Sequence, residues 1–174
     1  MGDHLWISRY ILQRIAEDFN VTISFAPKLF DDWCGSGCHT NFSTKTMREG
    51  NGGMEYINQM MEKFAAKHED HIAMYGDDNE KRLTGTLYTA AVNAFSYGIG
   101  NRSASMRIPT HTAHAAGKGY IEDRRPGSNI DPYVVCAMLV NTGVNAEDKS
   151  ADLKTAFSSW KKWRTENGLE RVEH

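Results

Sequence analysis

Apolar residues near the start of the chain recur at the spacing of an amphipathic helix. Asp3 is in position to cap this helix, and Asn20 ends it. One face of the predicted helix carries the apolar side chains Leu5, Ile11, Leu12, Ile15 and Phe19.

Four later segments favour β-strands. In the first, Val21, Ile23 and Phe25 alternate with polar residues, which is the period of a half-buried strand, and Pro27 ends it. The other three are polar or lack a helical period, and they span residues 39–44, 95–109 and 119–122. The residues between the last two strands, 110–118, are polar and predict a loop.

Three further regions predict helices. Residues 56–64 place apolar side chains at helical spacing, and a second short helix is expected near Ile72 and Tyr75. Asp131 followed by Pro132 is typical of an N-cap and the first helical residue. The last helix is expected from about residue 150 and should bury Leu153, Phe157 and Trp160. The chain shows no repeats or linkers, which indicates one domain of mixed helix and strand.

Composition limits the class of protein. The chain has 174 residues, 20 Lys and Arg against 22 Asp and Glu, and three Cys. Its net charge of −2 argues against nucleic-acid binding through counterion release. No apolar run approaches the ~20 residues of a bilayer span, and the first residues lack the basic and apolar regions of a secretory signal. An odd number of cysteines fits a reducing compartment, so we expect a cytoplasmic protein that binds neither nucleic acid nor membranes.

Polar residues that packing does not require gather in three segments. Glycine allows close approach of the backbone to a ligand, histidine and carboxylates ligate metals, and arginine binds carboxylate or phosphate. Each segment also has an ordinary interpretation as a glycine turn, solvated charges or a local salt-bridge cluster. Together they favour a site for an anionic substrate, phosphate and a divalent cation. The segments are 35–43 with His39, 101–107 with Arg102 and Arg107, and 122–126 with Glu122 and Arg124.

Three local patterns have competing interpretations. Arg102 and Arg107 are five residues apart, so a regular strand would place them on opposite faces unless a bulge redirects one. Cys34, Cys38 and His39 are spaced like zinc ligands, but no fourth ligand follows at a matching interval, so we do not expect zinc. The aromatic and basic residues of the last helix suggest a membrane or calmodulin-type face, although such helices more often dock their aromatics.

The three polar segments occur in the same order in a known enzyme family. The chain closely resembles the C-terminal part of the catalytic domain of eukaryotic-type glutamine synthetases, from residue 1 to about residue 140. The resemblance assigns residues 1–142 to a catalytic domain without its N-terminal β-grasp domain, and 143–174 to a divergent C-terminal helix and tail. The matching blocks are residues 1–6, 37–45, 81–85, 101–109 and 122–126.

The resemblance implies an α+β fold, with a curved antiparallel sheet and flanking helices. It also implies ATP-dependent ligation of ammonia to glutamate through γ-glutamyl phosphate, with ATP and Mg²⁺ or Mn²⁺ as cofactors. In this family the sites are shared between neighbouring subunits of stacked rings. The expected assembly is therefore a homo- or hetero-oligomer with glutamine synthetase-type subunits.

The resemblance also implies roles for individual residues. Phosphoryl transfer between anions is catalysed mainly by positioning and charge neutralisation, which cationic side chains and metal ligands provide. The implied roles are metal ligation by His39 and Glu122, stabilisation of phosphate charge by Arg107 and Arg124, binding of glutamate or phosphate by Gly35, Arg82 and Arg102, and contact with ATP by Ser43 and Arg48.

The chain departs from the family pattern at several positions. Leu29 replaces a usual proline, and Cys34 replaces an asparagine before the glycine loop. Tyr88 takes the place of the flap glutamate, and a phenol with a reference pKa of about 10 is a poor substitute for a carboxylate that deprotonates ammonium. The strands that carry most of the family's metal-binding glutamates precede the point where residue 1 begins, which leaves His39 and Glu122.

Two hypotheses about function follow from these patterns. In the first, the chain is a glutamine synthetase polypeptide that is incomplete or inactive in isolation. In the second, it is a non-catalytic, truncated paralogue that acts as a binding or assembly module. The matching blocks favour the first hypothesis, and the replacement of the flap glutamate by Tyr88 favours the second.

Overall fold

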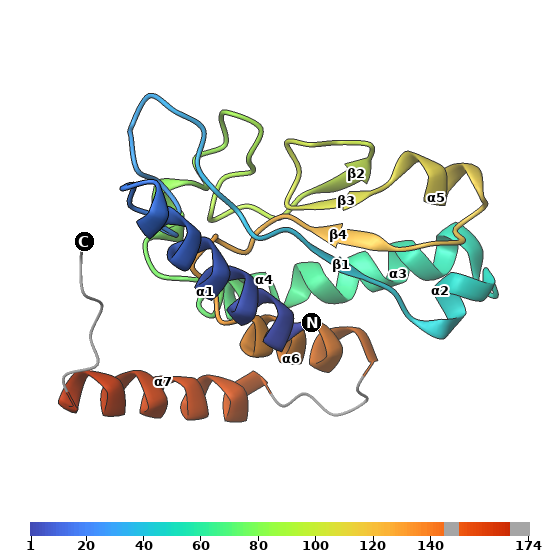
Figure 1. Ribbon diagram of the computed structural model, residues 1–174. Coiled ribbons are helices and arrows are strands. Elements are labelled where there is room, and N and C mark those ends of the chain that lie inside the picture. The colour runs from blue at the N-terminus through green and yellow to red at the C-terminus, as the bar shows by residue number, and fades with distance from the viewer. Residues whose placement is uncertain (145–149, 168–174) are drawn as a thin grey trace.

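The computed structural model describes residues 1–144 and 150–167. Within these residues, seven α-helices and one 3-10 helix accompany a four-stranded sheet (Figure 1). The helices are α1 (Gly2–Asp18), α2 (Lys45–Glu49), α3 (Gly53–Ala66), α4 (His68–Ile72), η1 (Asn79–Lys81), α5 (Thr110–His114), α6 (Pro132–Val144) and α7 (Ser150–Glu166). The strands are β1 (Thr40–Phe42), β2 (Tyr97–Ile99), β3 (Met106–Ile108) and β4 (Ile121–Asp123). None of the described helices combines the length and apolar character that crossing a membrane requires.

The sheet has the strand order β1-β4-β3-β2. β4 runs antiparallel to β1, with Thr40 opposite Asp123, and antiparallel to β3, with Arg107 opposite Glu122. β2 and β3 are parallel, with Gly98 beside Arg107, so the sheet is mixed where the family resemblance implies an antiparallel one. The α+β class is confirmed. Because β4 has a partner on each side, its residues lie next to residues of both β1 and β3.

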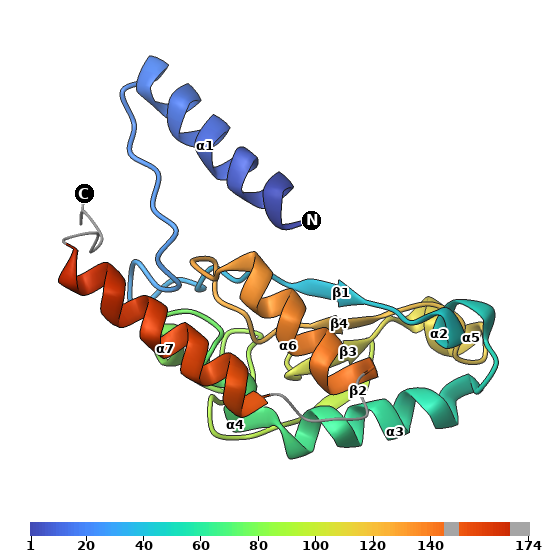
Figure 2. The ribbon, with the colours of Figure 1, turned by 90° about the horizontal axis from the view of Figure 1, so that it is seen from below.

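The hydrophobic core joins the sheet to α3 and α6, which lie along it (Figures 1 and 2). Full burial of one such side chain contributes about 1.5–3 kcal/mol. Leu153 and Phe157 of α7 pack against this core and are partly buried, as the helical pattern predicts. The fully buried members from the sheet and from α3 and α6 are Met106, Ile108, Ile121, Ile57, Met60, Met61, Phe64, Val135 and Met138.

Side-chain caps determine where two helices begin. The predicted cap of α6 is confirmed: Pro132 is its first residue, and the carboxylate of Asp131 accepts a 2.8 Å hydrogen bond from the backbone N–H of Tyr133. The hydroxyl of Thr44 caps α2 in the same way, because it accepts from the N–H of Met47 at 3.2 Å. Only Ser43 and Thr44 lie between the end of β1 and the start of α2.

The predicted strand at residues 21–25 is wrong. These residues form neither helix nor strand. Ile23 and Phe25 are half-buried while Val21 and the polar residues between are exposed, so the alternation reflects burial on one side. No ladder of hydrogen bonds accompanies this burial, because none of the four strands in the described part of the chain pairs with the segment.

The predicted strand at 95–109 is two strands rather than one. β2 and β3 flank a turn in which Gly100 has φ 65°, a left-handed conformation that glycine adopts without strain. The predicted loop at 110–118 begins with the short helix α5. Its first residues follow Pro109, whose fixed φ precedes the helical turn.

α1 forms over the predicted region, but it begins at Gly2 after Met1, so the predicted cap at Asp3 is wrong, and most of its apolar face is exposed. Figure 2 shows α1 standing away from the sheet. Its buried residues are Gly2, Arg9 and Ala16, whereas Phe19 at its end is 72% exposed. Trp160 of α7, also predicted to be buried, is 40% exposed. Sequence period identifies the apolar face of a helix but not whether another element covers it.

Candidate active site

The carboxylate of Glu122 is the centre of a compact polar cluster. Glu122 is buried, and its Oε1 lies 3.0 Å from Nδ1 of His39 and accepts a 3.1 Å hydrogen bond from Nη1 of Arg124. Its Oε2 lies 2.5 Å from Nε of Arg107, an ion pair whose angle does not meet hydrogen-bond geometry. Two guanidiniums and one imidazole therefore surround one carboxylate.

Sheet register brings these four residues together from three segments. Arg107 on β3 is directly opposite Glu122 on β4, so the two side chains share a face of the sheet. Arg124 is two residues beyond Glu122, which returns it to the same side of the extended chain. His39 immediately precedes β1, the other neighbour of β4. Four candidates that are scattered through the sequence thus form one site.

The cluster carries more positive than negative charge. Burial lowers the pKa of His39, and the adjacent charge of Arg124 acts in the same direction, against the attraction of Glu122. Burial also lowers the pKa of the Arg124 guanidinium, with Glu122 opposing this effect and Arg107 adding to it. Because one carboxylate faces two fixed guanidiniums, the cluster can accept a further anion.

Arg82 lies next to this cluster and packs against the glycine loop, the turn that contains Gly35 and Gly37. Nη2 of Arg82 donates to the carbonyl oxygens of Arg124, Arg125 and Pro126 at 3.3, 2.7 and 3.1 Å. Burial, followed by the charge of Arg124, lowers the pKa of Arg82 to about 10. A Cβ atom at Gly35 would lie 2.3 Å from Cγ of Arg82, so only glycine allows this close approach. Arg82 and the glycine loop therefore support the turn that follows β4.

Arg102 and Arg107 line one small cavity. The cavity has a volume of about 270 Å³ and is also lined by His111 and Tyr120. A regular strand would separate the two arginines, but the chain turns between β2 and β3, so the strand rule does not apply to Arg102. Two guanidiniums at one cavity suit an anionic group such as a carboxylate or phosphate.

Ser43 and Arg48 lie together just beyond the end of β1. The Ser43 hydroxyl donates to the carbonyl oxygen of Gly119 at 2.7 Å, and Nη1 of Arg48 donates to the carbonyl oxygen of Ser43 at 3.0 Å. Arg48 is otherwise exposed. Among the described contacts, neither side chain touches the Glu122 cluster, and their contact with ATP stays a prediction.

Tyr88 lies on an exposed loop. Its side chain is 70% exposed, and Leu87 and Tyr88 have φ values of 50° and 63°. Consecutive non-glycine residues in the left-handed region are strained, which marks the loop as locally unusual. Thr84 and Ala91 form an isolated β-bridge that closes the loop. The proposed flap role of Tyr88 stays a prediction.

The donors present fit part of a divalent-cation site. His39 offers an imidazole nitrogen, and Oε2 of buried Glu122 makes only the ion pair with Arg107 within the described residues, so this carboxylate oxygen keeps a lone pair for a ligand. The described part of the chain contains no group of three His, Cys, Asp or Glu arranged around one point. Hard divalent cations take six or more ligands, mostly oxygen, so these two residues would supply a minority of the coordination. The three cysteines are free, and no zinc site forms among the described residues.

A buried polar network on the other face of β4 was missed by sequence reasoning. Asp123 accepts from Nε and Nη2 of Arg125 at 2.9 and 2.8 Å and from the hydroxyl of Tyr75 at 2.8 Å. Arg125 also contacts Nδ1 of His68 at 3.2 Å, and Tyr75 contacts Nδ1 of His71 at 2.5 Å. The alternation of side chains along a strand could have revealed this network. It places Asp123 and Arg125 on one face of residues 122–125, and Glu122 and Arg124 on the other.

The charges of this network are balanced within the fold. Burial would raise the pKa of Asp123, but Arg125 and its hydrogen bonds outweigh this effect and lower it. Burial, with the charge of Arg125 acting in the same direction, lowers the pKa of His71 to about 3. Asp123 and Arg125 therefore stay ionised as a pair and His71 stays neutral. Their contacts hold β4 in place on the face opposite Glu122.

Comparison with known proteins places the chain in a family. A family model described as the catalytic domain of glutamine synthetase matches residues 1–159. The glutamine synthetase of Suillus bovinus is 57% identical over 145 residues, covering 83% of this chain and 40% of that protein. The Saccharomyces cerevisiae glutamine synthetase is 53% identical over 158 residues, covering 90% of this chain and 42% of that protein.

Solved structures show the same fold. The cryo-EM structure of Plasmodium falciparum glutamine synthetase superposes with a TM-score of 0.63 at 22% identity, over 82% of this chain and 29% of that one. A GmaS–ADP complex gives a TM-score of 0.60 at 21% identity, over 87% of this chain and 36% of that one. The chain spans about two fifths of the length of the fungal relatives. On the match of residues 1–159 and the fungal relatives, it belongs to the glutamine synthetase family.

Proposed function

We propose that this chain supplies part of the active site of an ATP-dependent glutamate–ammonia ligase. In this reaction the side-chain carboxylate of glutamate attacks the γ-phosphorus of ATP and releases ADP. A base first takes a proton from ammonium, and the resulting ammonia attacks the γ-carbonyl carbon of the γ-glutamyl phosphate. The nitrogen of the tetrahedral adduct then loses a second proton and inorganic phosphate leaves, which gives the amide. The observation that carries the proposal is the cluster in which Arg107, Arg124 and His39 converge on buried Glu122.

The geometry of the cluster suits chemistry between anions. Arg107 and Arg124 are held in place by Glu122, so their remaining donors are pre-positioned for phosphate oxygens. Arg102 extends this positive surface into the cavity that it shares with Arg107, where a substrate carboxylate fits. His39 and Glu122 would hold Mg²⁺ or Mn²⁺, which neutralises phosphate charge when bound. Gly35 and Arg82 border the glutamate, and Ser43 and Arg48 contact ATP, in this proposal.

We also propose that the chain does not turn over in isolation. Two metal ligands are fewer than a hard divalent cation takes, and Tyr88 is a weak base for ammonium. Further ligands would come from glutamine synthetase-type subunits in a homo- or hetero-oligomer. The division of the chain into a catalytic part at 1–142 and a divergent tail at 143–174 belongs to the same proposal.

The alternative is a non-catalytic assembly module, and Tyr88 is the observation that favours it. An exposed phenol on a strained loop cannot draw and deprotonate a cation as a carboxylate does. In this case the chain would associate with full-length glutamine synthetase without contributing to turnover.

The test measures γ-glutamyl hydroxamate formed from glutamate, hydroxylamine, ATP and Mg²⁺. The purified chain alone should give none, and turnover that His39→Ala abolishes would contradict this expectation. A chimera in which residues 1–159 replace the matching segment of the S. cerevisiae relative should turn over and should lose activity on Glu122→Gln. Arg14→Gln on exposed α1 is the matched control. An inactive chimera, together with co-purification of the chain with full-length enzyme, would favour the assembly module.

A further inference from the structure

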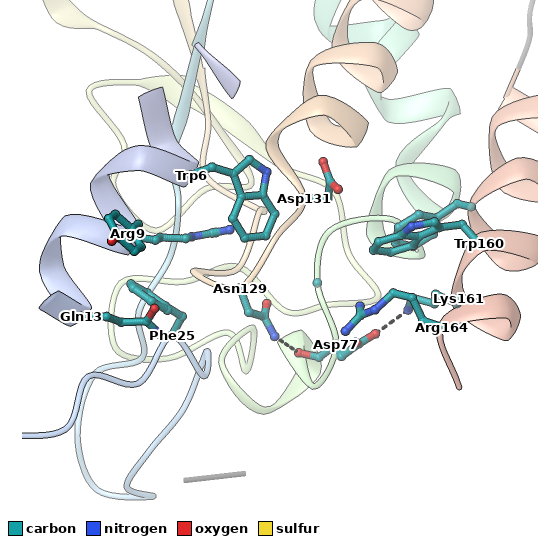
Figure 3. A pocket seen from close by; sticks show the side chains of 13 residues that line it. Trp6, Arg9, Gln13, Phe25, Asp77, Asn129, Asp131, Trp160, Lys161 and Arg164 are labelled. Atoms are coloured by element: carbon teal, nitrogen blue, oxygen red, sulfur yellow. Dashed lines mark hydrogen bonds and ion pairs between the residues drawn. The ribbon is translucent and has the colours of Figure 1, made fainter. Parts of the chain in front are cut away.

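A second cavity lies between α1 and α7, on different elements from the Glu122 cluster (Figure 3). Its volume is about 330 Å³, which is within the range of small-molecule sites. α1 and the segment after it line one side, and α7 lines the other. The turns at 76–77 and 129–131 form the floor, where Asn129 donates to the carbonyl oxygen of Asp77. The cavity is therefore built from four separate segments.

Arg9 is a buried cation without an acidic partner. Only 6% of the residue is exposed, and its Nη2 donates to the carbonyl oxygens of Ser128 and Ile130 at 2.7 and 2.9 Å. No carboxylate of the described residues lies within ion-pair distance of it. Cys38 and then Asp131 are the groups whose charge opposes the effect of burial on Arg9, but neither pairs with it, and the Asp131 oxygen caps α6 instead. A buried charge without a counter-ion is unfavourable, so an anion beside Arg9 would be stabilising.

The geometry of Arg9 leaves donors for that ligand. Nε and Nη1 make no hydrogen bond within the described residues, whereas Nη2 is fully used. Figure 3 shows the guanidinium extending from α1 into the cavity beneath Trp6. Burial lowers the pKa of Arg9 from its usual value, which is the direction that an anion would reverse.

Aromatic rings face the cavity from both sides. The guanidinium carbon of Arg9 lies 4.8 Å from the ring centre of Trp6 and 5.4 Å from that of Phe25. On α7, Trp160 stacks on Phe157 with ring centres 5.6 Å apart and planes at 22°. Figure 3 shows Trp160 opposite the Trp6 and Arg9 side. The guanidinium carbon of Arg164 lies 4.9 Å from the ring centre of Trp160, so each wall combines an aromatic ring with a cation, which suits a flat group that carries negative charge.

We propose that this cavity binds a small aromatic anion, a ring that carries a carboxylate or a phosphate monoester. The anionic group pairs with Nε and Nη1 of Arg9, and the ring occupies the space between Trp6 and Trp160. The ion pair Lys161–Asp77 closes the outer edge of the floor. This site is independent of the proposed ligase reaction, because it shares none of that reaction's residues.

The test follows the indole N–H signals of the four tryptophans by ¹H–¹⁵N NMR, assigned with single Trp→Phe variants. Phenyl phosphate and indole-3-carboxylate are the probes, and their relative affinities identify the anionic group. Inorganic phosphate and cyclohexanecarboxylate control for a bare anion and for a non-aromatic ring. Trp6 and Trp160 should shift on titration to about 10 mM, a range set by the small size of the probes. Trp33 and Trp163 lie outside the cavity and should not shift.

Variants separate a ligand site from a structural clamp. Trp160→Leu should weaken probe binding at least about tenfold, with Trp163→Leu on the same helix as the matched control. Arg9→Gln should abolish probe binding. If this variant does not fold, Trp160→Leu still tests whether the cavity binds the probes. The proposal is overturned if neither probe moves Trp6 and Trp160, if all four indoles move together, if inorganic phosphate or cyclohexanecarboxylate binds equally well, or if Trp160→Leu binds normally. Arg9 would then only tie α1 to residues 128–130.

Discussion

Glu122 and Asp123 are adjacent on β4, yet they belong to separate polar systems on opposite faces of the sheet. Glu122 contacts His39, Arg107 and Arg124 in the candidate active site. Asp123 is fully buried with Arg125 and the hydroxyl of Tyr75. The position of Glu122 therefore depends on a network that no ligand of the candidate active site needs to touch.

Tyr75→Phe tests the structural importance of this network. The change removes the hydroxyl that donates to Asp123 and leaves a buried carboxylate with one donor fewer. We expect the free energy of unfolding to fall by about 1–3 kcal/mol in urea titrations. Tyr88→Phe removes an exposed hydroxyl and should change it by less than about 0.5 kcal/mol. Equal effects of the two variants would contradict the argument.

The neutral state of His71 predicts how stability depends on pH. The pKa of His71 is about 3 in the fold and near 6.5 in the unfolded chain, so between these values the unfolded chain binds a proton that the fold does not. Stability should therefore fall as the pH drops from about 6.5 towards 3, by up to about 1.4 kcal/mol per pH unit. The pKa of Asp123 is also lowered in the fold. Its protonation therefore reduces stability further only when the pH falls below about 3.8, its pKa in the unfolded chain.

The comparison between pH 7 and pH 5 isolates this effect from that of Asp123. In His71→Gln, the difference in unfolding free energy between the two pH values should shrink by roughly 1–2 kcal/mol. His4→Gln on exposed α1 is the control and should keep the wild-type difference. An unchanged difference in His71→Gln would show that His71 does not resist protonation in the fold.

Gly35→Ala tests the contact between the glycine loop and Arg82. The new Cβ would lie 2.3 Å from Cγ of Arg82 and 2.6 Å from the carbonyl oxygen of Pro27, and a backbone atom cannot move away as easily as a side chain. We expect a loss of about 1–3 kcal/mol, as for other overpacked sites, measured by thermal or urea unfolding. Ser36→Ala, one exposed residue further on, should be close to neutral. A stable Gly35→Ala chain would show that the loop can shift.

Metal binding is predicted to depend on His39 and Glu122. Under the proposed function, His39→Ala and Glu122→Gln should each weaken Mn²⁺ binding at least about tenfold, because each removes one of two ligands. Free Mn²⁺ can be measured by electron paramagnetic resonance in titrations of the chain. Glu62→Gln changes an exposed carboxylate on α3 and is the matched control. If Mn²⁺ binds equally well to both ligand variants, the metal site lies elsewhere.

Local signals in the sequence predicted the longer helices but missed the short helices α2 and α5. The Asp131–Pro132 pair located the start of α6, and the apolar period of 56–64 identified α3. These features depend on neighbouring residues, so a local pattern contains the information. The strand at 21–25 failed because a strand also needs a partner, and the alternation of Ile23 and Phe25 with polar residues does not provide one.

The candidate site was predicted through the family motifs, and its geometry was not. That Arg107 faces Glu122 depends on the register of β3 and β4, which no local pattern encodes. That Arg102 and Arg107 share a cavity depends on the turn between β2 and β3. Arg9 gave no signal, because one arginine on an amphipathic helix looks like any solvated charge.

The hydrogen bonds around Tyr75 have a consequence for where protons sit. Ionised Asp123 can only accept, so Tyr75 must direct its single proton to it, and the Tyr75 oxygen then accepts from Nδ1–H of His71. Neutral His71 therefore carries its proton on Nδ1, and its Nε2 accepts from the hydroxyl of Thr142 at 2.8 Å. A hydroxyl on α6, an imidazole on α4 and a phenol thus form a one-way chain of donors that ends on β4. Thr142→Val interrupts this chain at its origin, whereas Thr142→Ser preserves its direction.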